Sequence, residues 1–185
     1  MIVNPNIIVN KEEVAGAKVP AAWRARHPFA NFPAKERYPV SEDRKLQKMA
    51  FPFIQVAPRP SKPREKGLTI VADRGIGMHR VEDLLETAGE YIDYFKIAIG
   101  AYRLQSEALI KRKVAALHKA GTKVFFAGDV SEAAIMQGVI KDFYKTVKKF
   151  GAEAVEVSNA QIAISLQDKC ELIRMATAQG LKVVA

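Results

Sequence analysis

The chain has 185 residues, 49% of them hydrophobic and 26% charged, a composition that excludes a disordered or fibrous protein. Its formal net charge of +9 is concentrated at one end: residues 1–66 hold thirteen Lys or Arg and six Asp or Glu, a balance of +7, and the remainder carries +2. A basic arm on a nearly neutral domain argues against nucleic-acid binding by the domain. A single cysteine, no long apolar run and no signal-peptide pattern lead us to expect a cytoplasmic protein with no membrane partner.

Proline and glycine divide the chain. All nine prolines lie between Pro5 and Pro63, and ten of the eleven glycines lie from Gly67 onward. Because proline removes a backbone donor and restricts its predecessor, we predict a Pro-rich basic arm over 1–66 and a folded domain over 67–185. In the arm we expect short helices at 12–17 and 43–48, and aromatic anchors at Trp23, Phe29 and Phe32.

The domain reads as alternating strands and helices. Strands are predicted over 67–73, 94–100, 122–128, 154–158 and 181–185, and helices over 81–91, 106–120, 131–150 and 166–179. Glycine follows three of these helices as a left-handed cap, at Gly121, Gly151 and Gly180. Cys170 lies in the last predicted helix, where we expect a buried thiol. Apolar strands separated by amphipathic helices predict a parallel sheet, either doubly wound or part of an eightfold barrel; periodicity does not choose between them.

Polar residues gather at the predicted strand ends, where α/β folds place their chemistry. They are Asp73, Arg74, Lys96, Gly100, Gly128, Asp129, Glu156, Ser158 and Asn159. Lys96 and Glu156 lie inside apolar strands, where a charge costs several kcal/mol unless it is paired or ligated. They could form an interior ion pair, or act as a proton donor and a metal ligand. The oxygens of Asp73 and Glu156 suit Mg2+, and no Cys/His spacing suggests zinc.

Two blocks of sequence carry a family resemblance. The stretch Pro58-Arg-Pro-Ser-Lys-Pro-Arg-Glu-Lys-Gly-Leu-Thr-Ile-Val-Ala-Asp73-Arg-Gly and the following 81–96 resemble the phosphosulfolactate synthase family, which also includes plant heat-stress-associated proteins. Gly151-Ala-Glu-Ala-Val-Glu156-Val-Ser158 extends the likeness. The resemblance implies a parallel (β/α) barrel of the TIM type. It also implies a lyase that adds sulfite to phosphoenolpyruvate with Mg2+, for coenzyme M or sulfolactate biosynthesis.

The resemblance also assigns roles. Asp73 and Glu156 are the expected metal ligands, and Lys96 is the expected acid or charge partner. Arg74 is a second catalytic candidate, standing where the family has lysine. The substrate-binding candidates are Gly75, Gly100, Ser158 and Asn159.

The loops after the strands depart from the family pattern. After the lysine of the second strand the family has Phe/Leu-Gly-Trp-Gly-Thr, whereas this chain has Ile97-Ala-Ile-Gly100-Ala. After the fourth strand the family has Ser-Asp-Gly, whereas this chain has Ser158-Asn159-Ala160. A non-catalytic family member, acting as a structural or stress-related interaction protein, is therefore the alternative hypothesis. We further expect the barrel to be truncated after its fifth strand, and the open edges to favour a homo-oligomer.

Overall fold

The computed structural model describes residues 21–26, 50–51, 54 and 59–185. The chain divides into two units, Met1–Arg59 and Pro60–Ala185. In the first, the structure shows helix α2 (Ala21–Arg26), which was not predicted. The helices predicted at 12–17 and 43–48 lie outside the described residues, as do the side chains of the three aromatic anchors.

The second unit alternates strands and helices as predicted. Its strands are β1 (Ile70–Asp73), β2 (Tyr94–Ile97), β3 (Lys123–Phe126), β4 (Ala154–Glu156) and β5 (Lys182–Val184). Its α-helices are α3 (Met78–Ala88), α4 (Glu107–Lys119), α5 (Gly128–Met136), α6 (Ile140–Lys149) and α7 (Leu166–Ala178), with short 3-10 helices η2 (Gly89–Tyr91) and η3 (Ala101–Leu104).

One predicted helix is wrong: the stretch 131–150 is two helices, α5 and α6. Gly138 has φ of 72° and ends α5 in a left-handed cap. The Val139 amide donates to Ala134 O at 2.8 Å and the Gly138 amide to Ile135 O at 3.0 Å, which is the bond pair of a Schellman motif. Because of this break, α5 ends at Met136 and α6 begins as a separate helix at Ile140.

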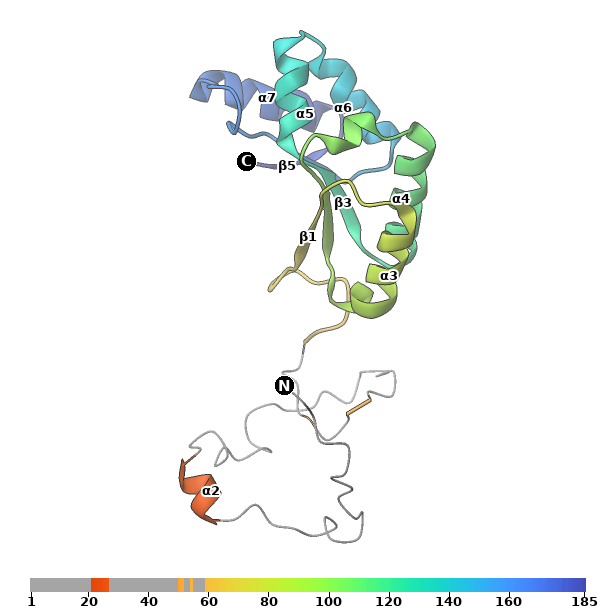
Figure 1. The fold of residues 1–185 in the computed structure, drawn as a ribbon. Coiled ribbons are helices and arrows are strands. Elements are labelled where there is room, and N and C mark those ends of the chain that lie inside the picture. Colours follow the sequence, from red (N-terminus) through yellow and green to blue (C-terminus); the bar gives the residue numbers. More distant parts are fainter. Residues whose placement is uncertain (1–20, 27–49, 52–53, 55–58) are drawn as a thin grey trace, which may run out of the picture. The chain divides into compact units, whose positions relative to one another are not determined.

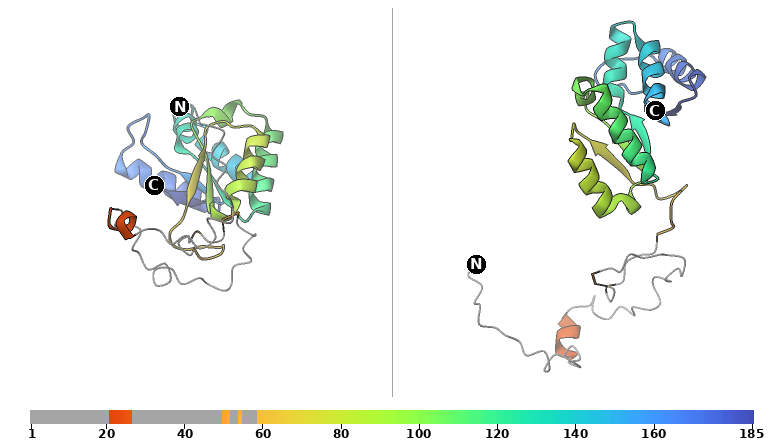
Figure 2. Two further views of the ribbon diagram at one scale, coloured as in Figure 1. Left: turned by 60° about the horizontal axis from the view of Figure 1, so that its bottom comes forward. Right: turned by 90° about the vertical axis from the view of Figure 1, so that its right-hand side faces the viewer.

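All five strands are parallel and lie in the order β1-β2-β3-β4-β5. A doubly wound sheet reverses its strand order and carries helices on both faces, so this alternative is wrong. Helices α3 and α4 lie together on one side of the sheet (Figures 1 and 2). The fold is an α/β fold with a parallel, sequentially ordered sheet. Within the described residues, no helix combines the length and apolarity needed to cross a membrane.

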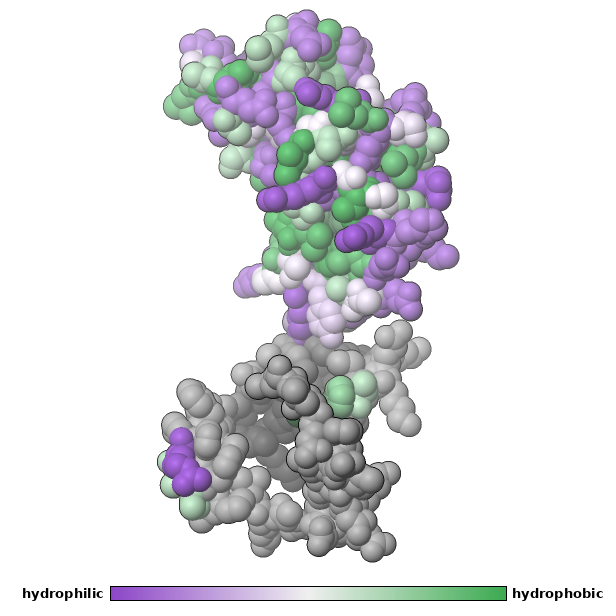
Figure 3. Space-filling model, in the orientation of Figure 1, coloured by the Kyte–Doolittle hydropathy of each residue, from purple (hydrophilic) through white to green (hydrophobic). Residues whose placement is uncertain are grey.

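The main core lies between the sheet and its helices. Alternate strand residues such as Phe95, Val124 and Phe126 pack there against Val114 and Leu117 of α4. Because side chains alternate along a strand, the residues between them point to the opposite face. That second face, called the uncovered face below, carries Tyr94, Lys96, Lys123, Phe125 and Glu156. Apolar surface is visible over and beside β1 (Figure 3), where Leu68 and Ile70 are exposed.

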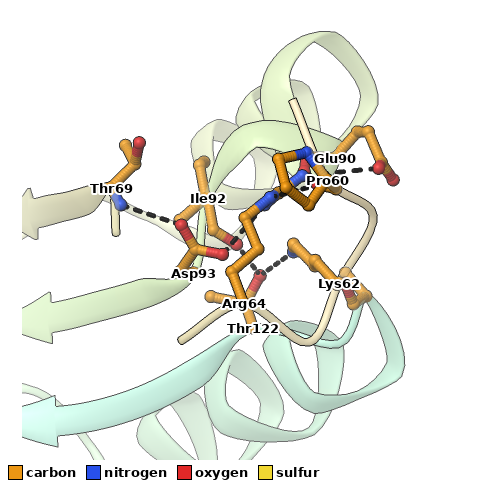
Figure 4. A network of polar contacts seen from close by, with 9 residues as sticks. Pro60, Lys62, Arg64, Thr69, Glu90, Ile92, Asp93 and Thr122 are labelled. Carbon is orange, nitrogen blue, oxygen red and sulfur yellow. Dashed lines mark hydrogen bonds and ion pairs between the residues drawn. The ribbon is translucent and has the colours of Figure 1, made fainter. Parts of the chain in front are cut away.

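A polar network closes the end of the sheet at which the strands begin (Figure 4). Arg64 donates to Asp93 Oδ1 at 2.8 Å and to Glu90 O at 2.9 Å. Asp93 Oδ2 in turn accepts from the Thr69 amide at 2.8 Å. Lys62 donates to Thr122 Oγ1 at 2.9 Å. The unusual Pro-Arg-Pro-Ser-Lys-Pro-Arg string thus places its last two basic residues in a structural network, away from the strand ends that carry the candidate site.

Helix α7 corrects the expectation for Cys170. The helix begins after Ser165, whose hydroxyl accepts from the Asp168 amide at 3.1 Å. Its buried residues are Leu172 and Ala176, four positions apart on one face. Cys170 lies on another face and is exposed, so the prediction of a buried thiol is wrong.

Candidate functional site

The uncovered face carries a charged pair. Lys96 Nζ lies 2.8 Å from Glu156 Oε1, and the two side chains are 26% and 23% exposed. The Gly128 amide donates to Glu156 Oε2 at 2.8 Å, and Lys96 Nζ lies 5.9 Å from the centroid of the Phe125 ring. Each charge therefore has a partner while remaining accessible to a small molecule. The ion pair, one of the two alternatives that the sequence left open, is present in the structure, and the chemical role of the two residues stays a prediction.

Asp73 has a different environment. Its Oδ1 accepts from the amides of Gly75 and Ile76, both at 2.7 Å, and its Oδ2 lies 2.7 Å from Lys113 Nζ. The side chains of Asp73 and Lys113 are 1% and 0% exposed. Lys113 comes from α4, so Asp73 points toward the helices. Sequence reasoning missed Lys113, although a lysine beside Ile110, Val114 and Leu117 in one apolar stripe was a usable signal.

The two predicted metal ligands thus point to opposite faces of the sheet. No group of three or more His, Cys, Asp or Glu that could hold a metal occurs among the described residues. Mg2+ is commonly held by one or two carboxylates together with substrate oxygens. Both oxygens of each carboxylate are engaged, but the Glu156 side chain is 23% exposed on the uncovered face, whereas that of Asp73 is 1% exposed. The geometry favours Glu156 over Asp73, and Mg2+ binding stays a prediction.

The remaining predicted residues lie on the loops after the strands. Arg74 and Gly75 follow β1, and Arg74 is exposed. Gly100 follows β2 with φ of 56°. Ser158 and Asn159 follow β4, and Asn159 Nδ2 donates to Ile164 O at 3.1 Å. Ser158 lies against Gly128, whose amide donates to Glu156: a Cβ added at Gly128 would fall 2.7 Å from Ser158 Cβ.

A second residue that the sequence did not single out is Glu132 of α5, which is fully buried. Its carboxylate accepts hydrogen bonds from the Ser158 hydroxyl and from the amides of Ala160, Gln161 and Ile162. Burial alone would raise the pKa of Glu132, but these four donors outweigh it and lower the pKa. The side chain is therefore a buried carboxylate that organises the loop after β4.

A cavity of about 260 Å³ lies on the helix-covered side. Aromatic residues from three segments line it, namely Tyr102 of η3, Phe126 of β3, and Phe143 and Phe150 of α6 and its C-terminal cap. Phe126 belongs to the core between sheet and helices. The cavity is therefore separate from the Lys96–Glu156 pair on the uncovered face.

Comparison with known proteins shows which family the chain matches in sequence. Residues 57–185 match the sequence model described as (2R)-phospho-3-sulfolactate synthase (ComA). The phosphosulfolactate synthase of Methanothermobacter thermautotrophicus is 31% identical over 136 residues, which are 74% of this chain and 52% of the relative. That of Methanocaldococcus jannaschii is 33% identical over 65% of this chain and 48% of the relative. That of Bacillus subtilis is 28% identical over 65% of this chain and 47% of the relative. The chain spans about half the length of these curated relatives.

Proposed function

The chain belongs to the (2R)-phospho-3-sulfolactate synthase family, and from this premise we propose that it is a lyase that adds sulfite to phosphoenolpyruvate. Mg2+ dependence is part of the proposal. The three relatives are named phosphosulfolactate synthases, which supports this substrate pair. The observation that carries the proposal is the accessible Lys96–Glu156 pair, because these residues lie within the matched region and on the face of the sheet opposite α3 and α4.

We propose that this sheet is a segment of a β/α barrel. A barrel needs parallel strands in sequential order with the helices outside, and the order β1 to β5 meets that requirement. The uncovered face then corresponds to the barrel interior, and the ends of the strands correspond to its active-site rim. Lys96 and Glu156 lie at or next to those ends, on β2 and β4.

In the proposed reaction, the positive charge of Lys96 stabilises an anionic intermediate. The sulfur lone pair of sulfite attacks C3 of phosphoenolpyruvate, and the electrons of the C2–C3 double bond move into the carboxylate as an enediolate. A proton added to C2 completes phosphosulfolactate, and the phosphate ester stays intact. The ammonium of Lys96 is suited to stabilise the enediolate and to give C2 its proton, which solvent then replaces. Glu156 holds the Lys96 ammonium in place until that step.

A bound Mg2+ would supply Lewis-acid stabilisation of the charge that develops on the substrate carboxylate. Glu156 is the proposed protein ligand. Arg74 is exposed on the loop after β1 and is proposed to meet an anionic substrate group there. Gly75, Gly100, Ser158 and Asn159 are proposed to shape the substrate loops.

The second candidate is a non-catalytic family member. The exposed Ile99 favours it, because a 53% exposed aliphatic side chain at the rim suits contact with another macromolecule better than binding of two small anions. This candidate predicts a folded chain with no sulfite-dependent chemistry.

The test compares two lysines on the same face. Lys96→Met removes the proposed acid, whereas Lys123→Met removes a lysine that lies 5.4 Å from the Tyr94 ring at the other end of the strands. Sulfite-dependent consumption of phosphoenolpyruvate is measured with Mg2+. Loss of the acid should lower kcat by roughly 100-fold or more, and Lys123→Met should change it little. Equal activities in the Lys96→Met and parent chains would refute the assigned role of Lys96.

A further inference from the structure

Glu132 connects α5 to the loop after β4. It is the fifth residue of α5 and is fully buried. Four donors reach its carboxylate, and all come from residues 158–162: the amides of Ala160 and Ile162 at 2.9 Å, the amide of Gln161 at 2.6 Å, and the Ser158 hydroxyl. A carboxylate that accepts from this many converging donors fixes the path of the backbone, because its burial leaves those donors as its partners in place of water.

The same contacts extend to the charged pair. Ser158 packs directly against Gly128, where a Cβ would fall 2.7 Å from Ser158 Cβ and 3.2 Å from Ser158 N, so only glycine fits. Ser131 Oγ donates to Gly128 O at 2.6 Å and holds that residue from the helix side. The Gly128 amide donates to Glu156 Oε2 at 2.8 Å, and Glu156 Oε1 lies 2.8 Å from Lys96 Nζ. A continuous series of contacts therefore runs from Glu132 through Ser158 and Gly128 to Glu156.

We propose that Glu132 is a positioning residue for the Lys96–Glu156 pair: it holds Ser158 against Gly128, and this aims the Gly128 amide at Glu156. The carboxylate of Glu156 is thereby fixed with one oxygen toward Lys96. Glu132 itself touches no substrate. In its link to catalysis this inference rests on the proposed function, but the positioning of Glu156 is testable without turnover.

Amide hydrogen exchange, measured by NMR on the full chain, tests the positioning. Glu132→Gln replaces an acceptor oxygen with a donor that faces other donors. We expect exchange at Ala160, Gln161 and Ile162 to accelerate by roughly tenfold or more, as for the loss of a buried hydrogen bond. The decisive amide is that of Gly128, which makes no bond to Glu132 yet should accelerate as well.

Matched variants separate positioning from general loss of stability. Ser165→Ala removes the cap of α7 at the other end of the same loop and should leave Gly128 exchange unchanged. Ser158→Ala removes one link and should accelerate Gly128 exchange even if Glu132→Gln does not fold. Glu132→Asp, which keeps the charge, should restore part of the protection. Unchanged Gly128 exchange in Ser158→Ala and in a folded Glu132→Gln would overturn the proposal and limit Glu132 to ordering its loop.

Measurement of kcat and KM tests whether the positioning of Glu156 by Glu132 affects catalysis. If the chain adds sulfite to phosphoenolpyruvate, Glu132→Gln should lower kcat by at least about tenfold, because the pair is misaligned, and should also raise KM, because the loop that carries Ser158 and Asn159 is loosened. An equal loss in Ser165→Ala would contradict the catalytic link. A chain without turnover would remove the proposed function alone, and Gly128 exchange would still decide whether Glu132 positions Glu156.

Discussion

The carboxylate of Asp73 and the ammonium of Lys113 lie 2.7 Å apart, with both side chains almost wholly excluded from solvent. The pair joins α4 to the loop after β1, because Asp73 also accepts from the amides of Gly75 and Ile76. A residue that the sequence offers as a metal ligand thus holds together the scaffold beneath the candidate site.

This pair predicts an asymmetric loss of stability. Lys113→Met should lower the free energy of unfolding by about 3–5 kcal/mol, since it leaves Asp73 as a buried, unpaired charge. The double variant Asp73→Asn/Lys113→Met should be more stable than Lys113→Met alone, because the unpaired charge is gone. Denaturant unfolding measures all three chains. A loss below about 1 kcal/mol in Lys113→Met would contradict a dry, paired site.

Removal of the Tyr144 hydroxyl should raise the free energy of unfolding, whereas removal of the Lys113 ammonium should lower it. Among buried side-chain oxygens and nitrogens of the described residues, its hydroxyl is without a hydrogen-bond partner. Tyr144→Phe should therefore stabilise the chain by about 1 kcal/mol. Tyr102→Phe is the control and should destabilise, because the Tyr102 hydroxyl donates to Ala127 O at 2.9 Å. Thermal unfolding of both variants checks the contrast, and a destabilised Tyr144→Phe would show that its hydroxyl has a partner.

Burial also raises the pKa of Tyr144 from 10.0 to about 12. The folded state then holds the phenolic proton more tightly than the unfolded chain. Its contribution to stability is complete below pH 10 and declines as the pH rises to about 12. Unfolding measured between these pH values should show a shallower decline in Tyr144→Phe than in the parent chain. Identical slopes would argue against burial as the cause.

Ile99 carries backbone strain at the rim. Its φ is 60°, a left-handed conformation that costs a residue with a Cβ about 1–2 kcal/mol. Ile99→Gly should stabilise the chain by up to about 1 kcal/mol, because relief of strain exceeds the greater flexibility of glycine when unfolded. Gly100→Ala, at φ of 56°, should have the opposite sign. Chemical denaturation tests both, and loss of stability in Ile99→Gly would mean that its side chain makes a contact that compensates the strain.

Arg64 should be the main stabilising residue of the network at the beginning of the strands. Arg64→Met removes the guanidinium that donates to Asp93 Oδ1 and Glu90 O, and we expect a loss of about 1–3 kcal/mol. The exposed Arg112 supplies the control, since Arg112→Met should change stability by no more than about 0.5 kcal/mol. Similar unfolding midpoints for the two variants would remove the structural explanation of the Pro-Arg-Pro-Ser-Lys-Pro-Arg string.

The sequence predicted the parallel sheet well, because alternation of apolar strands with amphipathic helices is a local property. It did not predict the break at Gly138, since the helical pattern resumes immediately after it and the cap depends on backbone geometry. The candidate site was predicted in part. Lys96 and Glu156 stood out as charges in apolar strands and are paired.

The interpretation of Asp73 as a metal ligand has a physical cause. A charged residue at a strand end shows its chemistry in the sequence but not the face to which it points. Asp73 was grouped with Glu156 because both end a strand, and only packing shows that Lys113 draws Asp73 to the helix side. Glu132 was missed for another reason: a glutamate on a helix is usually exposed, and its partners lie about thirty residues further along the chain.

The most direct measurement of the central claim is phosphorus NMR of phosphoenolpyruvate incubated with the chain, Mg2+ and sulfite. The proposed addition keeps the phosphate ester on C2 and saturates the neighbouring double bond. The account predicts a new phosphate monoester signal that needs sulfite and disappears in Lys96→Met but persists in Lys123→Met. An unchanged phosphoenolpyruvate signal with the folded parent chain, or release of free phosphate regardless of sulfite, would contradict it.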